Sequence, residues 1–263
     1  MNYKQIKVHS LINKITKNDT LFGGNYTIDP YQNCEFGCLY CDSSFDKTIY
    51  IKSNAADILR KEIKQIDKGV IIIGSVHDPY QKAEEKNQIT RDLLKIIEKN
   101  NFPCHILTKS DLIIRDTELL SKIENCKITI SLTSIDKEVS NIFEKNVPSP
   151  KKRLQTINKL SEAGIIVGLA NIPLLPYISD GEIENIIKSA KNHNAKHFLY
   201  RYLELKGDQK LCFYKILKEF YPNLLEKYQK LYKDSYQPNS KYLSEINNDI
   251  SRLCNKYKLK NKI

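Results

Sequence analysis

The chain has 263 residues, of which 41% are hydrophobic and 28% charged, and a formal net charge of +11. This size suits one large α/β domain with a short appendage, whose core needs no disulfide or metal for stability. No apolar run approaches the roughly 18 residues of a membrane span, and no signal peptide is apparent, so we expect no membrane partner. Seven cysteines in no pairing pattern favour a reducing compartment, the cytoplasm.

Residues 1–25 are rich in lysine and asparagine, and we expect an N-terminal extension that ends at Gly23 and Gly24. A short strand at 26–29 then leads into the stretch NCEFGCLYCD at residues 33–42. This stretch holds three cysteines within eight positions, namely Cys34, Cys38 and Cys41. Three cysteinates on a short loop suit a [4Fe–4S] cluster whose fourth iron keeps an open site for a reactive ligand.

Three simpler interpretations of these cysteines stay open. Positions i, i+4 and i+7 share one face of a helix, so the thiols can be inert core residues, although Gly37 and the missing apolar periodicity argue against a helix. A disulfide would leave one of the three cysteines over. A structural zinc site would need a fourth ligand, which is not visible nearby.

Strand and helix patterns alternate beyond the cysteine loop. The expected strands are short runs of apolar residues at 26–29, 70–74, 105–108, 127–133, 165–171 and 197–202. We predict helices with Ser53, Thr90 and Ser149 as their N-caps, and two further helices after Asp116 and from Asp180. This alternation predicts a parallel sheet with right-handed crossovers. Because six units are too few for a closed eight-stranded barrel, we predict the α/β fold class, with an open three-quarter (β/α)6 TIM-like barrel at residues 26–205.

Residues 206–263 have an all-helical pattern, with helices expected at 211–220, 222–232 and 242–257. We expect this appendage to pack on the barrel. It carries 13 Lys and Arg against 6 Asp and Glu, a net charge of +7. Because such a surface attracts phosphates, nucleic acid is a candidate partner. The alternative is that these lysines only reflect a compositional bias and lie on solvent-exposed helix faces. Arginine, which usually contacts the bases, is scarce.

Polar side chains follow several of the expected strands. Functional groups of parallel barrels gather at the carboxyl ends of the strands. This rule selects Ser75 to Asp78, Thr108 and Lys109, Ser131 to Thr133, and Asn171 to Pro173.

The pattern C-x3-C-x2-C, with Tyr40 directly before its last cysteine, resembles the signature of the radical S-adenosylmethionine (SAM) enzymes. The segments GSVHDPYQ at 74–81 and ILTKS at 106–110, with Ser149 and Pro150, are similar to the spore photoproduct lyase-like, or DNA repair photolyase-like, branch. The similarity runs from about residue 26 to about residue 236. The resemblance implies the same partial-barrel fold.

The resemblance also implies cofactors and site residues. A [4Fe–4S] cluster bound by Cys34, Cys38 and Cys41 would receive an electron from a donor such as flavodoxin or ferredoxin. It would cleave SAM to a 5′-deoxyadenosyl radical, which abstracts hydrogen from a substrate. The positions that match SAM contacts are Tyr40, Asp78, Lys109, Ser131, Asn171 and Ile172, and we assign Ser75 and His77 to catalysis.

Simpler roles stay open for several of these residues. Asp78 before Pro79 can be a turn former, Ser131 a satisfied strand hydroxyl, and His77 a solvated loop residue. Lys109 can serve only to close the helix at Arg115 and Asp116 electrostatically.

Two positions depart from the photoproduct lyases. Those enzymes return hydrogen to the substrate from a cysteine where this chain has Ser75, whose O–H bond is too strong to donate hydrogen readily. They also carry a tyrosine after the last cluster cysteine, where this chain has Asp42. The four other thiols do not replace the donor, because they precede strands or lie on appendage helices; they are Cys104, Cys126, Cys212 and Cys254.

We therefore interpret the chain as a diverged member that lacks the hydrogen-donor cysteine, and we do not expect photoproduct lyase activity. The expected protein is a radical SAM enzyme, lyase-like or an oxidoreductase, acting on an unassigned substrate such as nucleic acid or a nucleotide. Two alternatives stay open: a peptide or small-molecule substrate, or a non-catalytic metal-cluster module that binds nucleic acid.

Overall fold

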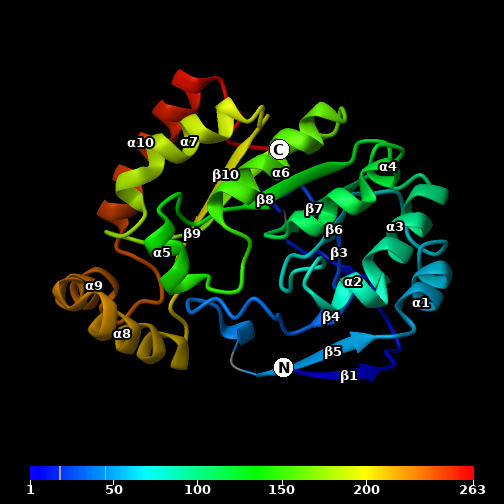
Figure 1. Cartoon of the computed structure of the whole chain (residues 1–263), viewed down its shortest axis with the longest axis horizontal. Helices are drawn as coiled ribbons and strands as arrows, with labels where there is room; N and C mark the ends of the chain where they lie inside the picture. The colour runs from blue at the N-terminus through cyan, green and yellow to red at the C-terminus, as the bar shows by residue number, and fades with distance from the viewer. Residues whose placement is uncertain (18, 45) are drawn as a thin grey trace.

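The centre of the molecule is a parallel sheet, seen in Figure 1 in a computed structural model that describes residues 1–17, 19–44 and 46–263. Its seven strands lie in the order β10-β9-β8-β7-β6-β3-β2. They are β2 (Asn13–Lys14), β3 (Tyr26–Ile28), β6 (Ile71–Ile73), β7 (Cys104–Thr108), β8 (Lys127–Ser131), β9 (Ile166–Leu174) and β10 (Phe198–Tyr202).

Six of these strands are parallel and adjacent in chain order, from β3 to β10; β2 alone pairs antiparallel. The run Ile71–Ile73 is buried throughout, as expected for a strand covered on both faces. Among the described strands β10 and β2 are the two edges, so the barrel does not close. The predicted open barrel of six parallel strands is confirmed.

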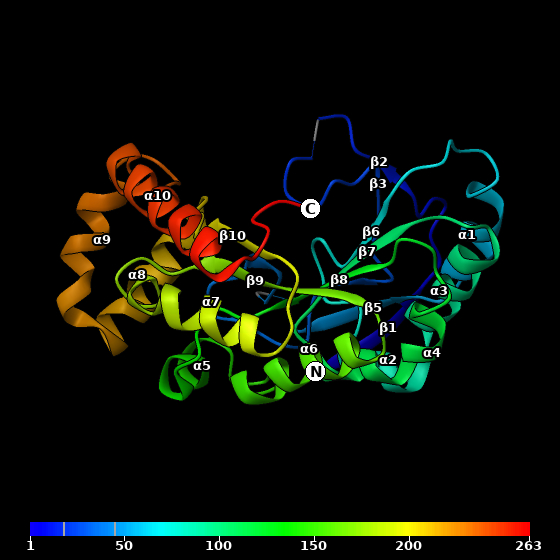
Figure 2. The same cartoon turned by 90° about the horizontal axis from the view of Figure 1, so that it is seen from above.

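Helices connect the strands and cover the sheet. They are α1 (Ala55–Glu62), α2 (Ala83–Asn87), α3 (Ile89–Lys99), α4 (Thr117–Leu120), α5 (Lys137–Phe143), α6 (Pro150–Glu162) and α7 (Ile183–Asn192). Figure 2 shows α2, α4, α5 and α6 along the same side of the sheet. The helix α6 begins as predicted, with Pro150 at its first position and the Ser149 hydroxyl accepting from the backbone N–H of Lys152.

Two predicted helix caps are wrong. Ser53 lies before the cap position Asn54, and its hydroxyl donates instead to the carbonyl of Ile6. Thr90 lies inside α3, and its hydroxyl donates to the carbonyl of Pro79. In both cases a tertiary partner that no local pattern indicates takes the hydroxyl group.

The polar N-terminal segment contains strands that its sequence pattern does not indicate. β1 (Asn2–Ile6) pairs parallel with β5 (Thr48–Lys52), which pairs antiparallel with β4 (Tyr31–Gln32). This small second sheet leads directly into the cysteine loop, because β4 ends at Gln32.

Three helices follow the sheet: α8 (Asp208–Phe220), α9 (Leu225–Tyr232) and α10 (Ser240–Tyr257). In Figure 1, α8 and α9 lie together at one end of the molecule and α10 lies beside α7. Two buried tyrosines join α9 to the rest of the molecule: Tyr228 donates to the carbonyl of Pro176 at 2.6 Å, and Tyr232 to that of Leu203 at 2.9 Å. None of the described helices has the length and apolarity needed to cross a bilayer.

Candidate functional site

The three closely spaced cysteines lie on an irregular loop between β4 and the 3-10 helix η1 (Asp42–Ser44). Gly37 has a φ of +59°, a left-handed conformation that glycine adopts without strain. The chain forms turns at this point, so the interpretation of the thiols as one face of a core helix is wrong. Within the described ranges, the cysteines form no disulfide bond with one another.

These cysteines open into a cavity of about 430 Å³ at the carboxyl ends of the sheet strands. Tyr40, Ser75, Asp78, Lys109, Ser131 and Ile172 line the same cavity. Nine residues, from the cysteine loop and from the ends of four strands, thus share one space. Apolar side chains complete much of the wall, including Phe36, Leu107 and Pro173.

Burial dominates the electrostatics of the thiols. It raises the pKa of Cys34 to about 12, with a further contribution from the carboxylate of Asp78. Burial likewise raises the pKa of Cys38 to about 12, while the charge of Lys109 acts in the opposite direction. Both thiols therefore keep their protons at neutral pH unless a metal replaces them.

Buried polar side chains hold the cysteine loop from outside the cavity. The amide of Gln81 bonds backbone groups on both sides of Cys34. In return, the carboxylate of Glu35 accepts from the backbone N–H of Ala83 at 2.6 Å and from the hydroxyl of Tyr3, in β1, at 2.9 Å. The loop, the segment after β6 and the N-terminal strand are thereby fixed to one another.

Lys109 lies at the centre of the polar lining. Its Nζ donates to the hydroxyl of Ser131 at 2.9 Å, and this hydroxyl donates to the carbonyl of Ile172 at 3.1 Å. The same Nζ lies 5.9 Å from the centre of the Tyr40 ring. Three strands, β7, β8 and β9, therefore bring one cation, one hydroxyl and one carbonyl together.

The carboxylate of Asp78 holds the backbone of Lys109 in place. Its Oδ2 accepts from the backbone N–H of Lys109 at 2.7 Å, and its Oδ1 accepts from the hydroxyl of Thr108 and the backbone N–H of Tyr80. Burial raises the pKa of Asp78 against the opposing effect of these bonds. A carboxylate has about four lone-pair positions, so one position stays available to a ligand.

A buried network holds the ring of Tyr40. Its hydroxyl bonds both Thr133 and the carboxylate of Glu144, and Glu144 forms an ion pair with Arg153 at 2.6 Å. Burial alone would raise the pKa of Glu144, but the charges of Arg153 and Lys109 outweigh it and hold that pKa below its usual value. Arg153 also donates to the carbonyl of Ser131 at 2.9 Å, so the network reaches two walls of the cavity.

Two predicted residues do not line the cavity in the part of the chain that the structure describes. Asn171 is fully buried behind it, and its amide group donates to the carbonyls of Leu132 and Thr133. His77 lies beside Asp29, whose carboxylate accepts from its backbone N–H at 3.4 Å. Burial lowers the pKa of His77, which favours the neutral ring. Their assignments stay predictions.

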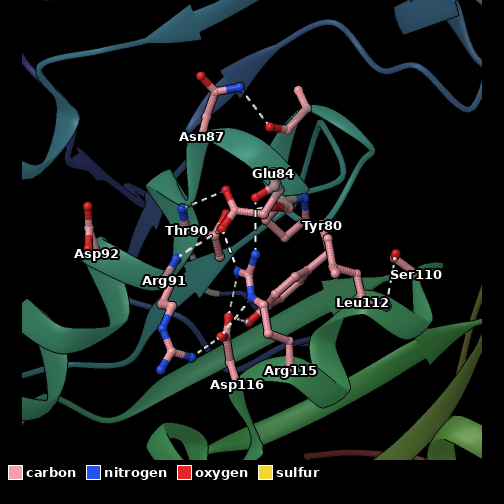
Figure 3. A network of polar contacts seen from close by, with 12 residues as sticks. Tyr80, Glu84, Asn87, Thr90, Arg91, Asp92, Ser110, Leu112, Arg115 and Asp116 are labelled. Atoms are coloured by element: carbon pink, nitrogen blue, oxygen red, sulfur yellow. Dashed lines mark hydrogen bonds and ion pairs between the residues drawn. The ribbon is translucent and has the colours of Figure 1, made fainter.

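Ion pairs behind the cavity fix the elements that carry Asp78 and Lys109. In Figure 3 the guanidinium group of Arg115 lies between the carboxylates of Glu84 and Asp116, at 2.8 and 2.9 Å. Tyr80 donates to Asp116 at 3.1 Å. Glu84 also accepts from the backbone N–H of Thr90, so it takes the cap role that the sequence assigns to Thr90.

Sequence reasoning missed several residues of the site. Gln81 lies inside the quoted segment 74–81 but received no role, while Glu144 and Arg153 lie in no motif. The appendage also contributes, because the amide of Gln209 donates to the carbonyl of Tyr40 and Lys206 lines the cavity. Glu144 and Arg153 are charged side chains that are almost completely buried, and burial is not visible in the sequence.

The donor set fits an iron–sulfur cluster. Three thiols with no fourth cysteine line the described cavity, and clusters are held by cysteinates that bind separate irons. No group of three or more His, Cys, Asp or Glu side chains in the described ranges could surround a single metal ion.

Comparisons with known proteins agree with this geometry. The family model described as the radical SAM superfamily matches residues 28–190. An uncharacterized protein of Mycobacterium bovis is 26% identical, over 98% of this chain and 82% of its own length. An uncharacterized protein of Methanocaldococcus jannaschii is 29% identical, over 78% of this chain and 79% of its own.

Solved structures share the fold. Spore photoproduct lyase complexed with dinucleoside spore photoproduct matches with a TM-score of 0.72 at 15% identity, over 97% of this chain and 79% of that one. Streptococcus suis SuiB bound to its precursor peptide SuiA matches with a TM-score of 0.53 at 16% identity, over 77% of this chain and 46% of that one.

Proposed function

Because this chain belongs to the radical SAM superfamily, whose members use a [4Fe–4S] cluster and SAM, we propose that Cys34, Cys38 and Cys41 bind the cluster in the cavity they share. The observation that carries the proposal is that these cysteines line the same space as Lys109 and Ser131. When bound, the two cofactors supply hydrogen abstraction by a 5′-deoxyadenosyl radical.

The polar lining suits the groups of SAM. Lys109 offers the cation for its carboxylate, and its ammonium group is already directed by Ser131. The remaining lone pair of Asp78 accepts from a ribose hydroxyl group. We assign the ring of Tyr40 and the backbone at Asn171 and Ile172 to the adenine.

The apolar lining has a different role. Phe36, Leu107 and Pro173 reduce the number of water molecules beside the reacting atoms, which protects a radical from side reactions. Ser75 lies on the cavity wall next to Asp78, and we assign it and His77 to the substrate side of the site.

We propose a nucleic acid or a nucleotide as the substrate. The formal net charge of +11 supports it, because a basic protein attracts phosphates. A solved structure with the same fold contains a dinucleoside photoproduct. Ser75 stands at the hydrogen-donor position, and among the described residues no cysteine besides the three proposed cluster ligands lines the cavity, so repair of that photoproduct is not proposed.

One observation favours a peptide or a small molecule instead. Asp42 lines the same cavity, and its carboxylate repels a phosphate, while the charge of Lys206 is paired with that of Glu204 at 2.5 Å. Transfer of hydrogen from a labelled substrate to 5′-deoxyadenosine separates the two classes. A nucleotide substrate predicts transfer from oligonucleotides or nucleotides and none from peptides.

The test of the class is reconstitution of the full chain with iron and sulfide without oxygen. We expect a [4Fe–4S] spectrum and, with dithionite and SAM, release of 5′-deoxyadenosine. Cys38→Ala should abolish both, whereas Cys212→Ala, in α8 and outside the cavity lining, should retain both. A fully loaded protein that releases no 5′-deoxyadenosine would favour a non-catalytic cluster module.

A further inference from the structure

A second cavity of about 490 Å³ lies at the opposite end of the sheet from the cysteines. Its walls include Lys127 and Ile166, the first residues of β8 and β9, and His197, directly before β10. Ser131, which lines the first cavity, is the last residue of β8. The length of a strand therefore separates the two cavities.

Among the described residues, six lysines and no acidic side chain line this second cavity, together with Ile263, the last residue of the sequence; the lysines are Lys127, Lys191, Lys196, Lys258, Lys260 and Lys262. We refer to it as the lysine cavity. None of the six forms an ion pair within the described ranges. By contrast, Lys256, two residues before Lys258, pairs with Glu184 at 2.6 Å.

Tertiary pairing of the C-terminal tail assembles this charge. After α10 the tail returns to the sheet (Figure 2), where the carbonyl of Lys260 accepts from the backbone N–H of Phe198 at 2.8 Å. The backbone N–H of Lys260 in turn donates to the carbonyl of Lys196 at 3.3 Å. Residues from the tail, the end of α7 and the start of β8 thus converge on one space.

The lysine content of the chain does not explain the arrangement. The chain has 31 acidic residues, and the cavity at the cysteines is lined by both signs of charge, with Asp42 and Glu204 beside Lys109 and Lys206. Like charges around one cavity repel each other, and a concave surface of one sign focuses the field on its interior. An anion in the cavity removes this repulsion.

The lining also indicates how the anion is bound. His197 is the only ring on the described walls, so stacking platforms for bases are absent there. Ile166, 43% exposed, adds an apolar wall. We propose that the lysine cavity binds a phosphate-bearing polyanion through its phosphate groups, either a free polyphosphate or the backbone of a nucleic acid.

The test measures binding of inorganic triphosphate and of a fluorescent single-stranded oligonucleotide to the full, anaerobically purified chain. Lys196→Gln combined with Lys260→Gln should weaken binding of the recognised probe at least tenfold. If the chain binds the oligonucleotide, the same double variant should also reduce the magnitude of the slope of log affinity against log salt concentration by about 2, which is one for each lost phosphate contact. Preference between the two probes identifies the source of the phosphates.

Lys218→Gln combined with Lys241→Gln is the matched control, since both lysines are exposed appendage residues outside the cavity lining. It should change affinity less than twofold. Equal losses in both double variants, or binding of neither probe, would overturn the proposal. Binding only to acidic lipid vesicles would overturn it too. Cys38→Ala should bind the probe normally, so this test is independent of the proposed radical chemistry.

Discussion

The side-chain amide of Gln81 bonds the backbone on both sides of Cys34. Its Nε2 donates to the carbonyl of Asn33 at 3.1 Å, and its Oε1 accepts from the backbone N–H of Glu35 at 2.9 Å. Gln81 is fully buried, so no water replaces these bonds when the amide is lost. One side chain from the segment after β6 therefore sets the position of a proposed cluster ligand.

Replacing Gln81 by leucine should loosen the cysteine loop and lower the amount of cluster that the chain retains. We expect at most half of the normal iron and sulfide after desalting, with broadened electron paramagnetic resonance signals of the reduced cluster. Gln229→Leu, an exposed residue of α9, should match the unchanged protein. Normal cluster content and signals in Gln81→Leu would show that the amide does not position Cys34.

Replacing Lys109 by methionine should weaken SAM binding, because it removes the ammonium group that we assign to the carboxylate of SAM. Hydrogen bonds to charged groups contribute about 1.5–3 kcal/mol, so the Kd should rise at least about tenfold. Equilibrium dialysis of the cluster-loaded chain measures it. Lys137→Met, an exposed residue of α5, is the control, and an equal Kd in both variants would remove Lys109 from the proposed site.

Breaking the ion pair between Glu144 and Arg153 should destabilise the fold strongly. Both side chains are almost completely buried, so Arg153→Met leaves an uncompensated carboxylate, at a cost of about 3–5 kcal/mol. Urea denaturation gives the free energy of unfolding. Glu144→Leu combined with Arg153→Met should recover much of the loss. Arg252→Met removes an exposed pair with Asp249 and should cost at most about 1 kcal/mol; a similar cost for Arg153→Met would contradict the prediction.

Two buried histidines should make stability depend on pH. Burial lowers the pKa of His105 to about 4 and that of His197 to about 3, and the hydroxyl of Thr129 lies 2.7 Å from both rings. Unfolding returns each pKa to about 6.5, so between these values the unfolded chain binds more protons than the native one. The free energy of unfolding should therefore fall as pH drops below about 6.5, by up to about 1.4 kcal/mol per unit for each histidine.

Urea denaturation of the chain without cluster, at pH 5 and pH 7, measures this difference. His105→Gln should reduce the difference, whereas His9→Gln, at an exposed position, should leave it unchanged. Equal stability of the unmodified chain at the two pH values would refute the assignment.

The alternation of apolar runs and capped helices was sufficient to predict six parallel strands and an open barrel. Such patterns are local, because periodicity and caps depend on residues a few positions apart. Tertiary contacts overrode the pattern at Ser53 and Thr90, whose hydroxyl groups bond distant carbonyls. They also formed β1, whose exposed polar residues have no strand signal and pair with β5 across some 46 positions.

For the site, the sequence alone determined the proposed cluster ligands, since Cys34, Cys38 and Cys41 lie within eight positions and a cluster needs thiols on one short loop. Only the tertiary structure decided what surrounds them. Gln209 reaches Tyr40 across 169 positions, and the tail carries Lys260 back to Phe198. Contacts of this separation depend on how the strands and helices pack, which no spacing in the sequence records.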